Sequence, residues 1–152
     1  MKKITLFLLC IMAFTACSKE PLADRIKGSY GCEVRLLTRY QKDGKWRDTS
    51  YISKENNSVV ISRVDDNTVA IKATCKKWGE GVATAVSIDD NNYAANFSGS
   101  GQFTANGKTY DAMIDGSCGY DSHDIAVSVR IVGSTFPSGS GNKYILSFTN
   151  KR

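Results

Sequence analysis

The feature that most constrains this chain is an alternation of apolar and polar residues at every second position. Tyr30, Cys32, Val34 and Leu36 are each separated by one residue, and residues 69–75 repeat the pattern. A period of two is typical of a β-strand that buries one face. Further runs of the same kind lie at residues 46–53, 58–64, 82–88, 93–97, 108–118, 124–132 and 143–149. We therefore predict eight to ten strands.

Short polar segments between these runs predict tight turns. Asp43-Gly44 and Asn106-Gly107 suit two-residue hairpins, because both central residues of such a turn have positive φ. Residues 65–67 and 89–92 are Asp- and Asn-rich turns, and residues 133–142 form the longest irregular segment. Connections this short cannot make parallel crossovers, so the sheet is expected to be antiparallel and mostly sequential.

A sheet with one apolar face and no helix to cover it must bury that face against itself. Closure into a barrel achieves this and removes the exposed edges, which favours a barrel over a sandwich. We predict an all-β fold: an antiparallel meander closed into a roughly eight-stranded barrel over residues 28–152. A barrel of this size is filled by side chains or holds one small ligand. Residues 17–27 form a polar tether, with a short helical turn at residues 22–26.

The N-terminus has the three parts of a signal peptide. Lys2 and Lys3 precede an apolar run at residues 4–14, and small residues follow directly before Cys17. The apolar run is shorter than the roughly 20 residues that span a bilayer. Residues 1–16 are therefore expected to be removed.

Residues 14–17 (FTAC) resemble a bacterial lipobox in which Phe14 replaces the usual Leu. The resemblance implies cleavage before Cys17 and acylation of its thiol. Two or three acyl chains anchor a protein stably, since each buried CH₂ contributes about 0.8 kcal/mol. We expect a domain tethered by lipid in the cell envelope, at the outer membrane, with the side of that membrane left open.

The charge is modest but unevenly distributed along the chain. The 20 basic and 15 acidic residues give a net charge of +5, which does not indicate nucleic-acid binding. Residues 19–54 hold nine basic and five acidic residues, whereas residues 80–129 hold seven acidic residues and only Lys108. If these regions lie on different sides of the barrel, the domain is electrically two-sided.

The cysteines and the single histidine do not suggest a metal site or a cofactor. Cys32, Cys75 and Cys118 remain after Cys10 is removed and Cys17 is acylated. An oxidising envelope permits one disulfide, and the spacing leaves all three pairings open. No C-x-x-C motif occurs, so a zinc site lacks its ligands. The three thiols are in phase with apolar neighbours, which favours buried small side chains or an internal bridge.

No group of residues predicts catalysis. Ser122, His123 and Asp124 are neighbours in an expected turn, where they cannot align as nucleophile, base and orienting acid. The Asp- and Asn-rich turns break the calcium-loop pattern at Val69 and Tyr93. We therefore expect a protein that is not an enzyme.

Aromatic and glycine-rich segments supply the remaining candidates. Trp46 and Trp78 lie near strand ends beside basic residues. Each could line a barrel mouth in contact with a ligand or partner, and the alternative is packing at a barrel end. Residues 98–101 and 138–141 are Ser- and Gly-rich and do not open a helix, so flexible loops are expected. Phe136-Pro137 places a bulky apolar group on the longest loop.

Gly28-Ser29-Tyr30 resembles the start of the first strand in the calycins, where Gly-x-Trp or a relaxed form occurs. With the lipobox, the meander and the YILSF segment at residues 144–148, the mature chain resembles the calycin-like β-barrel lipoproteins of Gram-negative bacteria. The resemblance implies a lipocalin-like barrel in which Tyr30 closes one end, packed under Arg152 or Lys151.

We expect a non-catalytic binding module whose barrel takes a small apolar ligand, a peptide or a glycan. One alternative is an inhibitor of a protease or lysozyme that acts through Phe136 and Pro137. Another is an accessory or structural subunit of a surface complex. The expected partners are the membrane, through Cys17, and either a small hydrophobic ligand or an envelope protein, but not nucleic acid.

Overall fold

The computed structural model describes residues 20–132 and 143–150, most of which lie in β-strands. One short helix, α2 (Leu22–Ile26), precedes them. The strands are β1 (Gly28–Lys42), β2 (Lys45–Ser53), β3 (Asn57–Arg63), β4 (Thr68–Cys75), β5 (Gly79–Asp90), β6 (Ala94–Ala105), β7 (Lys108–Gly119), β8 (Ile125–Ile131) and β9 (Lys143–Asn150). The expected signal peptide and Cys17 lie outside the described residues.

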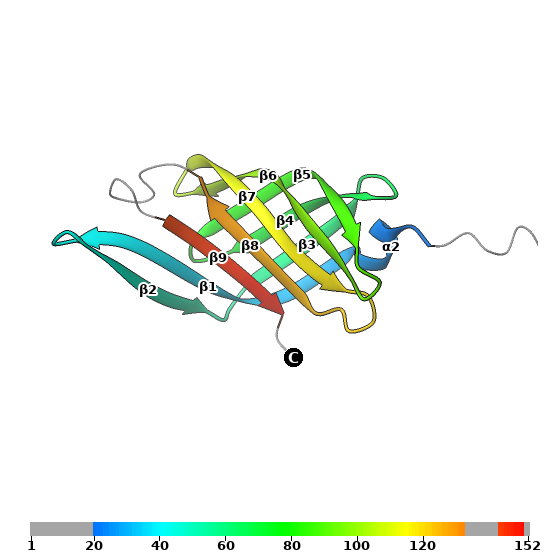
Figure 1. Ribbon diagram of the computed structural model, residues 1–152, viewed down its shortest axis with the longest axis horizontal. Coiled ribbons are helices and arrows are strands. Elements are labelled where there is room, and N and C mark those ends of the chain that lie inside the picture. The colour runs from blue at the N-terminus through cyan, green and yellow to red at the C-terminus, as the bar shows by residue number, and fades with distance from the viewer. Residues whose placement is uncertain (1–19, 133–142, 151–152) are drawn as a thin grey trace, which may run out of the picture.

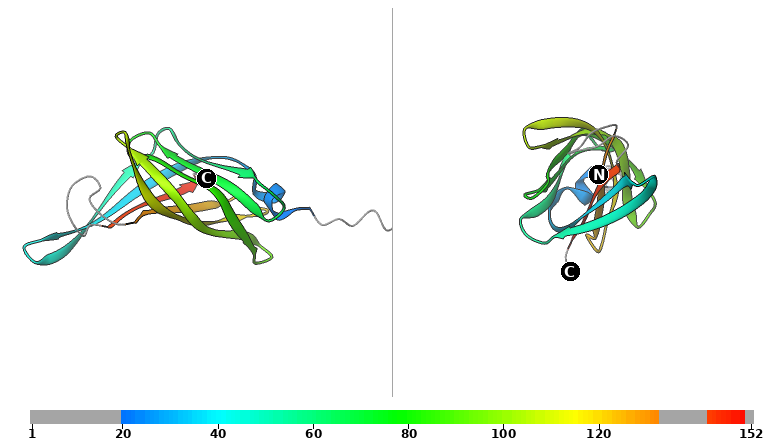
Figure 2. Two further views of the ribbon diagram at one scale, coloured as in Figure 1. Left: turned by 90° about the horizontal axis from the view of Figure 1, so that it is seen from above. Right: turned by 90° about the vertical axis from the view of Figure 1, so that its left-hand side faces the viewer.

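The sheet closes on itself through its first and last strands. Strands β3 to β9 pair antiparallel in sequence order, and β1 pairs with both β3 and β9. These eight strands form a closed barrel, and β2 is added outside it (Figure 1). The end-on view in Figure 2 shows the ring of strands. The predicted all-β fold with an eight-stranded antiparallel barrel is confirmed.

The predicted hairpin turns are also confirmed. Asp43 and Gly44 have φ values of 53° and 71°, and Asn106-Gly107 has values of 51° and 73°. In the turn between β3 and β4, the Asp65 carboxylate accepts a hydrogen bond from the backbone N–H of Asn67 at 2.9 Å. These side chains therefore build turns, as the Asp- and Asn-rich composition indicated.

Large side chains from one wall of the barrel meet small residues on the opposite wall. A Cβ added at Gly81 on β5 would lie 3.0 Å from both methyl groups of Val129 on β8 and 3.6 Å from Ile114 on β7. Because β5 and β8 are three strands apart in the sheet order, Val129 crosses the interior. The barrel is filled by side chains at this level.

The Ser- and Gly-rich residues 98–101 form part of strand β6, so the predicted flexible loop is wrong here. The strand pairs with β7 along its whole length. Gly99 and Gly101 face inward: a Cβ at Gly99 would lie 3.2 Å from Val86, and one at Gly101 only 2.4 Å from the carbonyl oxygen of Val82. Close packing requires glycine at these positions, and the resulting Ser- and Gly-rich composition is the same as that of a flexible loop. Residues 138–141 lie outside the described residues.

Helix α2 covers one end of the barrel (Figure 2). Ala23 and Ile26 are fully buried in the core, and the N–H of Ala23 donates to the carbonyl of Asp66 in the turn between β3 and β4. Arg63 pairs with both Asp24 and Asp66, which ties the helix to the same turn. The predicted helical turn is confirmed, and it packs against the barrel.

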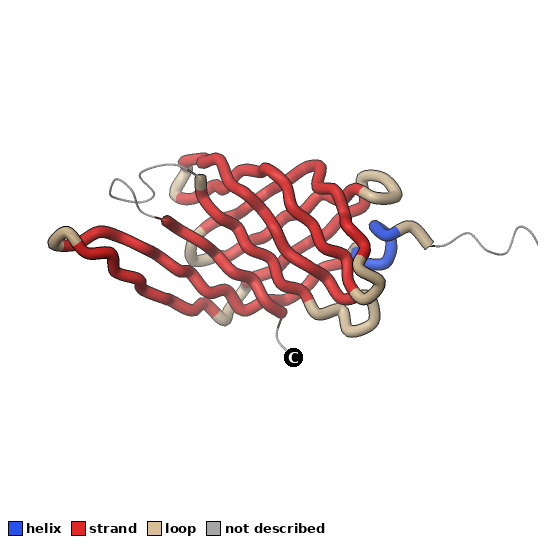
Figure 3. The backbone as a smooth tube through the Cα atoms, in the orientation of Figure 1, coloured by secondary structure: helices blue, strands red, loops and turns tan. Residues whose placement is uncertain are grey.

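The hairpin of β1 and β2 projects beyond the opposite end of the barrel (Figure 3). Residues 28–31 of β1 pair with β3, and residues 34–42 pair with β2 on the same edge. Three positions separate Gly31 from Val34, whereas five separate their partners Ser58 and Ser53. The two extra residues let the chain bend between β2 and β3. We call the paired ribbon of residues 34–53 the arm.

We predict that Gly101→Ala lowers the free energy of unfolding by about 1 to 3 kcal/mol, because its Cβ would overlap the Val82 carbonyl. Urea unfolding measures the change. Gly31→Ala is the matched control, since nothing lies within 4 Å of a Cβ at Gly31. Equal stability of the two variants would contradict the close approach of β5 to Gly101 on β6.

Candidate functional site

The arm exposes an unusual share of the protein's large apolar side chains. Leu37, Trp46, Tyr51 and Ile52 are 39%, 55%, 54% and 46% exposed, and they make up four of the seven exposed large hydrophobic residues in the described part of the chain. The inward-facing apolar residues of the barrel strands are, by contrast, buried. Exposed apolar groups gathered on one element indicate an interaction surface.

Pairing places these side chains on the two faces of the arm. Trp46 lies opposite Gln41, and Ile52 lies opposite Arg35; with Leu37 they belong to the outer face, which continues the outside of the barrel. Tyr51 lies opposite the buried Leu36, on the face that continues the barrel interior. Both faces of the arm therefore carry exposed apolar groups.

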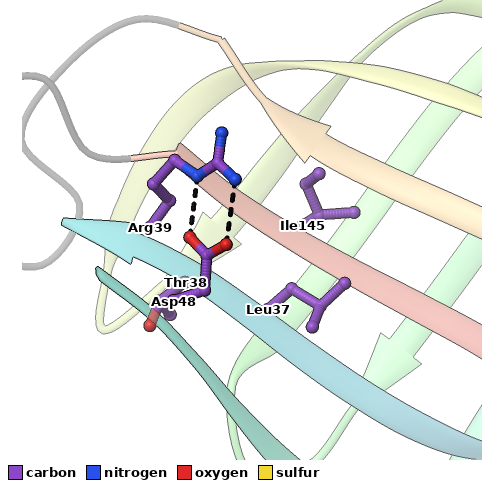
Figure 4. Close-up of a pocket in the computed structure, with 5 residues that line it drawn as sticks. All are labelled: Leu37, Thr38, Arg39, Asp48 and Ile145. Carbon is purple, nitrogen blue, oxygen red and sulfur yellow. Dashed lines mark hydrogen bonds and ion pairs between the residues drawn. The ribbon is translucent and has the colours of Figure 1, made fainter. Parts of the chain in front are cut away.

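A groove of about 320 Å³ lies at the base of the arm (Figure 4). Leu37 on β1 and Ile145 on β9 are register partners and give it an apolar side. Arg39 and Asp48 are cross-strand partners at its border, joined by two hydrogen bonds of 2.7 and 2.9 Å. These bonds lower the pKa of Asp48. Because both side chains are exposed, the pair orients the two groups but adds little stability.

The turns at the two ends of the barrel carry opposite charge. In an antiparallel meander alternate turns lie at the same end, and the turns beside α2 contain Asp65, Asp66, Asp89, Asp90, Asp121 and Asp124. The turns at the opposite end, including the tip of the arm, contain or adjoin one acidic residue, Asp43, and five lysines: Lys42, Lys45, Lys76, Lys77 and Lys108. Arg63 and Lys27 neutralise part of the acidic end through their ion pairs with aspartates. The turns at the two ends of the barrel thus differ in charge, although the division does not follow the two segments of the sequence.

The two tryptophans lie on different elements. Trp46 is in β2, on the arm. Trp78 is in the turn between β4 and β5, half-buried against the core, with the Lys77 ammonium 5.2 Å from its ring centroid. Their predicted role in ligand contact stays a prediction, and Trp46 is the more accessible of the two.

Tyr30 lies near the α2 end of the barrel. Its hydroxyl donates to the carbonyl of Ile26 at 2.7 Å, and the Cys118 thiol lies 3.4 Å from the same hydroxyl. Burial raises the pKa of Tyr30. The basic residue expected to pack on it, Arg152 or Lys151, lies outside the described residues, so the predicted barrel-end closure is untested. The predicted inhibitor residues Phe136 and Pro137 also lie outside them.

An aromatic and basic pair at this end was not predicted. The Arg25 guanidinium of α2 lies 3.5 Å from the ring centroid of Tyr120, which follows β7. The Tyr120 hydroxyl donates to the Asp90 carboxylate at 2.8 Å, and burial together with this bond raises its pKa to about 12. Tyr120 is the next inward-facing position after Cys118 in the alternation of β7, just beyond the end of the strand. That alternation is the sequence signal that could have predicted its burial.

The three cysteines of the described residues, Cys32, Cys75 and Cys118, are free and buried. Burial raises the pKa of Cys32 to about 11 and raises that of Cys118 as well. A raised pKa lowers the thiolate fraction, which is the reactive form. The sequence left open whether the three thiols are buried small side chains or form an internal disulfide, and the structure fits buried small side chains.

The turn at residues 120–124 contains no catalytic arrangement. His123 is exposed with φ of 50°, and the Ser122 hydroxyl accepts a hydrogen bond from the backbone N–H of Asp124 at 3.2 Å. The turn interpretation is confirmed. Within residues 20–132 and 143–150, no three potential metal ligands gather in one place. None of the helical structure described is long and apolar enough to span a bilayer.

Comparisons with known proteins do not assign a family. No family profile matches the chain, and no curated protein matches it. Among solved structures, the chain is similar to the ywiB protein from Bacillus subtilis, with 10% identity over 86% of this chain and 98% of that one. The TM-score is 0.27, at which the likeness supports no inference.

We predict that a protein starting after Cys17 exposes its three thiols only on unfolding. A chromogenic aromatic disulfide at about pH 8 should react slowly with the folded protein and with all three thiols in denaturant, because the three thiols are buried and burial raises the pKa of Cys32 and Cys118. An added cysteine at the exposed Thr109 serves as the reactive control. Fast reaction of the native thiols would contradict this arrangement.

We predict a loss of stability at alkaline pH. The pKa of Tyr120 is higher in the folded protein than in the unfolded chain, so folding favours its neutral phenol. The free energy of unfolding is therefore undiminished below pH 10 and falls as the pH rises towards 12. Tyr120→Phe should reduce this fall, although Tyr30 retains part of it. Tyr93→Phe changes an exposed ring and should not. Urea unfolding across this pH range is the measurement.

Proposed function

We propose that the protein is a non-catalytic, lipid-anchored module of the cell envelope that binds a partner protein through the arm. The observation that carries the proposal is the exposure of Trp46, Tyr51 and Ile52 on β2, which lies outside the barrel. Leu37 is exposed beside them on β1, where it also pairs with β9. Aromatic side chains are enriched in the energetically dominant parts of protein interfaces. The barrel then serves as a rigid base for the arm.

The packed interior supports binding on the outside. Val129 and Ile114 occupy the space beside Gly81 at one level of the barrel. A small apolar ligand bound at that level would have to displace side chains that already bury each other. A lipocalin-like cavity for such a ligand is the alternative, and analysis of molecules that co-purify with the protein tests it.

The position of the anchor supports display of the arm. The proposed lipid-carrying Cys17 precedes Glu20 by three residues, which span at most about 11 Å of extended chain. Glu20 leads directly into α2 at the acidic end of the barrel, and the tip of the arm lies at the other end (Figure 1). An anchor at Cys17 would therefore hold the acidic end near the membrane and direct the arm away from it.

The fold also supports the proposed relation to calycin-like lipoproteins. A closed eight-stranded antiparallel meander that starts at Gly28 and Tyr30 is compatible with that fold. An inhibited enzyme and a surface complex are two kinds of partner that the arm would suit. An inhibitory contact through Phe136 and Pro137 stays a separate prediction.

Photo-crosslinking in cells tests the proposed arm interface. A photoreactive residue at Ser50, on the outer face between Trp46 and Ile52, should form an adduct with an envelope protein. Substitution of Trp46 and Ile52 by Ser should reduce the adduct about tenfold or more, which corresponds to about 1.4 kcal/mol of lost binding. A photoreactive residue at Gln102, exposed on β6, is the control.

Two results would contradict this interface. One is the absence of any adduct from Ser50, and the other is an equal yield from Gln102. The substituted side chains are exposed, so thermal unfolding should show that the double variant remains folded.

A further inference from the structure

Strand β2 is the only strand of the described residues with an unpaired edge. The barrel closes through β1 and β9, whereas β2 pairs on one side only, with β1. The strand is nine residues long and contains no proline. An edge strand presents free N–H and C=O groups on which another strand can be built.

Charge indicates what kind of strand this edge accepts. The arm carries five basic residues and two acidic ones. Of the two acidic residues, Asp48 is already bound by Arg39. Among the ion pairs of the described residues, none involves Lys42, Lys45 or Arg47. The edge is therefore positive, which favours an acidic partner and opposes pairing with a second copy of itself.

The two faces of β2 differ in chemistry. Its outer face carries Trp46 and Ile52, with Asp48 between them already paired to Arg39. The other face carries Lys45 and Arg47 near the tip and Tyr51 nearer the barrel. A strand added beside β2 has side chains that alternate between the same two faces. Its apolar residues would lie beside Trp46 and Ile52, and its acidic residues beside Lys45 and Arg47.

We propose that β2 binds an extended segment of the partner protein in which acidic and apolar residues alternate, and that this segment joins the sheet as an additional strand. The inference rests on the proposed function and specifies the kind of partner that the arm takes. Main-chain hydrogen bonds hold the segment, and the two rows of side chains select it.

Peptide binding to the mature, acylated chain in detergent micelles tests the inference. The probe is a capped heptapeptide, Glu-Val-Glu-Ile-Glu-Val-Glu. It should bind and slow hydrogen exchange of the backbone amides of β2. A peptide with Lys in place of every Glu should bind at least about tenfold more weakly, because it has the wrong charge. A peptide with Pro in place of every apolar residue keeps the charge but cannot form a strand, and it should give no protection.

Charge exchange on the protein provides the matched variants. Lys45→Glu combined with Arg47→Glu should weaken the acidic peptide about tenfold and favour the lysine peptide instead. Lys76→Glu combined with Lys108→Glu makes the same change in charge at the barrel rim and should leave binding unchanged. These side chains are exposed, and thermal unfolding should show that both double variants remain folded.

Three results would overturn the inference. The proline peptide could bind as well as the strand-forming peptide, the protection could fall outside β2, or sedimentation could show a dimer that the acidic peptide does not dissociate. An adduct from Ser50 in cells without peptide protection of β2 would overturn this inference and leave the proposed function standing. If neither the adduct nor the protection is found, both proposals fail.

Discussion

The structure depends on the pairing of β1 with three other strands. Residues 28–31 pair with β3 and residues 32–39 pair with β9, which closes the barrel. Because β1 is fifteen residues long, its residues 34–42 also offer a second edge on which β2 forms, and residues 40–42 continue past the last pair with β9. One long strand therefore produces both the closed base and the projecting arm.

Closure has a consequence for where binding takes place. A Cβ at Gly81 would meet Val129 from across the barrel, and one at Gly101 would meet the Val82 carbonyl of the adjacent strand, so the space inside the barrel is occupied at both positions. A base filled in this way resists deformation, because close-packed interiors are stiff. Recognition is left to side chains outside the barrel interior, and among the described residues the arm carries most of the large apolar ones that are exposed.

Local chemistry explains which features were predictable. The alternation of side chains reflects burial of one strand face, and the Asp-Gly and Asn-Gly turns reflect positive φ, so strands and hairpins follow from short segments. Residues 98–101 show the limit of such reasoning, because their glycines are required by close contact with Val86 and Val82 on a neighbouring strand. The pair formed by Arg25 and Tyr120 likewise joins residues that are distant in the chain.

The sequence by itself determined the all-β class, the antiparallel order and the turns, since each depends on residues close together in the chain. Only the tertiary structure decided that β2 lies outside the barrel, because the bend before β3 arises from a register mismatch against β1. It also decided that the charges separate along the axis, because strand direction assigns each turn to an end. Trp46 and Trp78 are equivalent in the sequence, and long-range pairing alone places one on the arm and the other against the core.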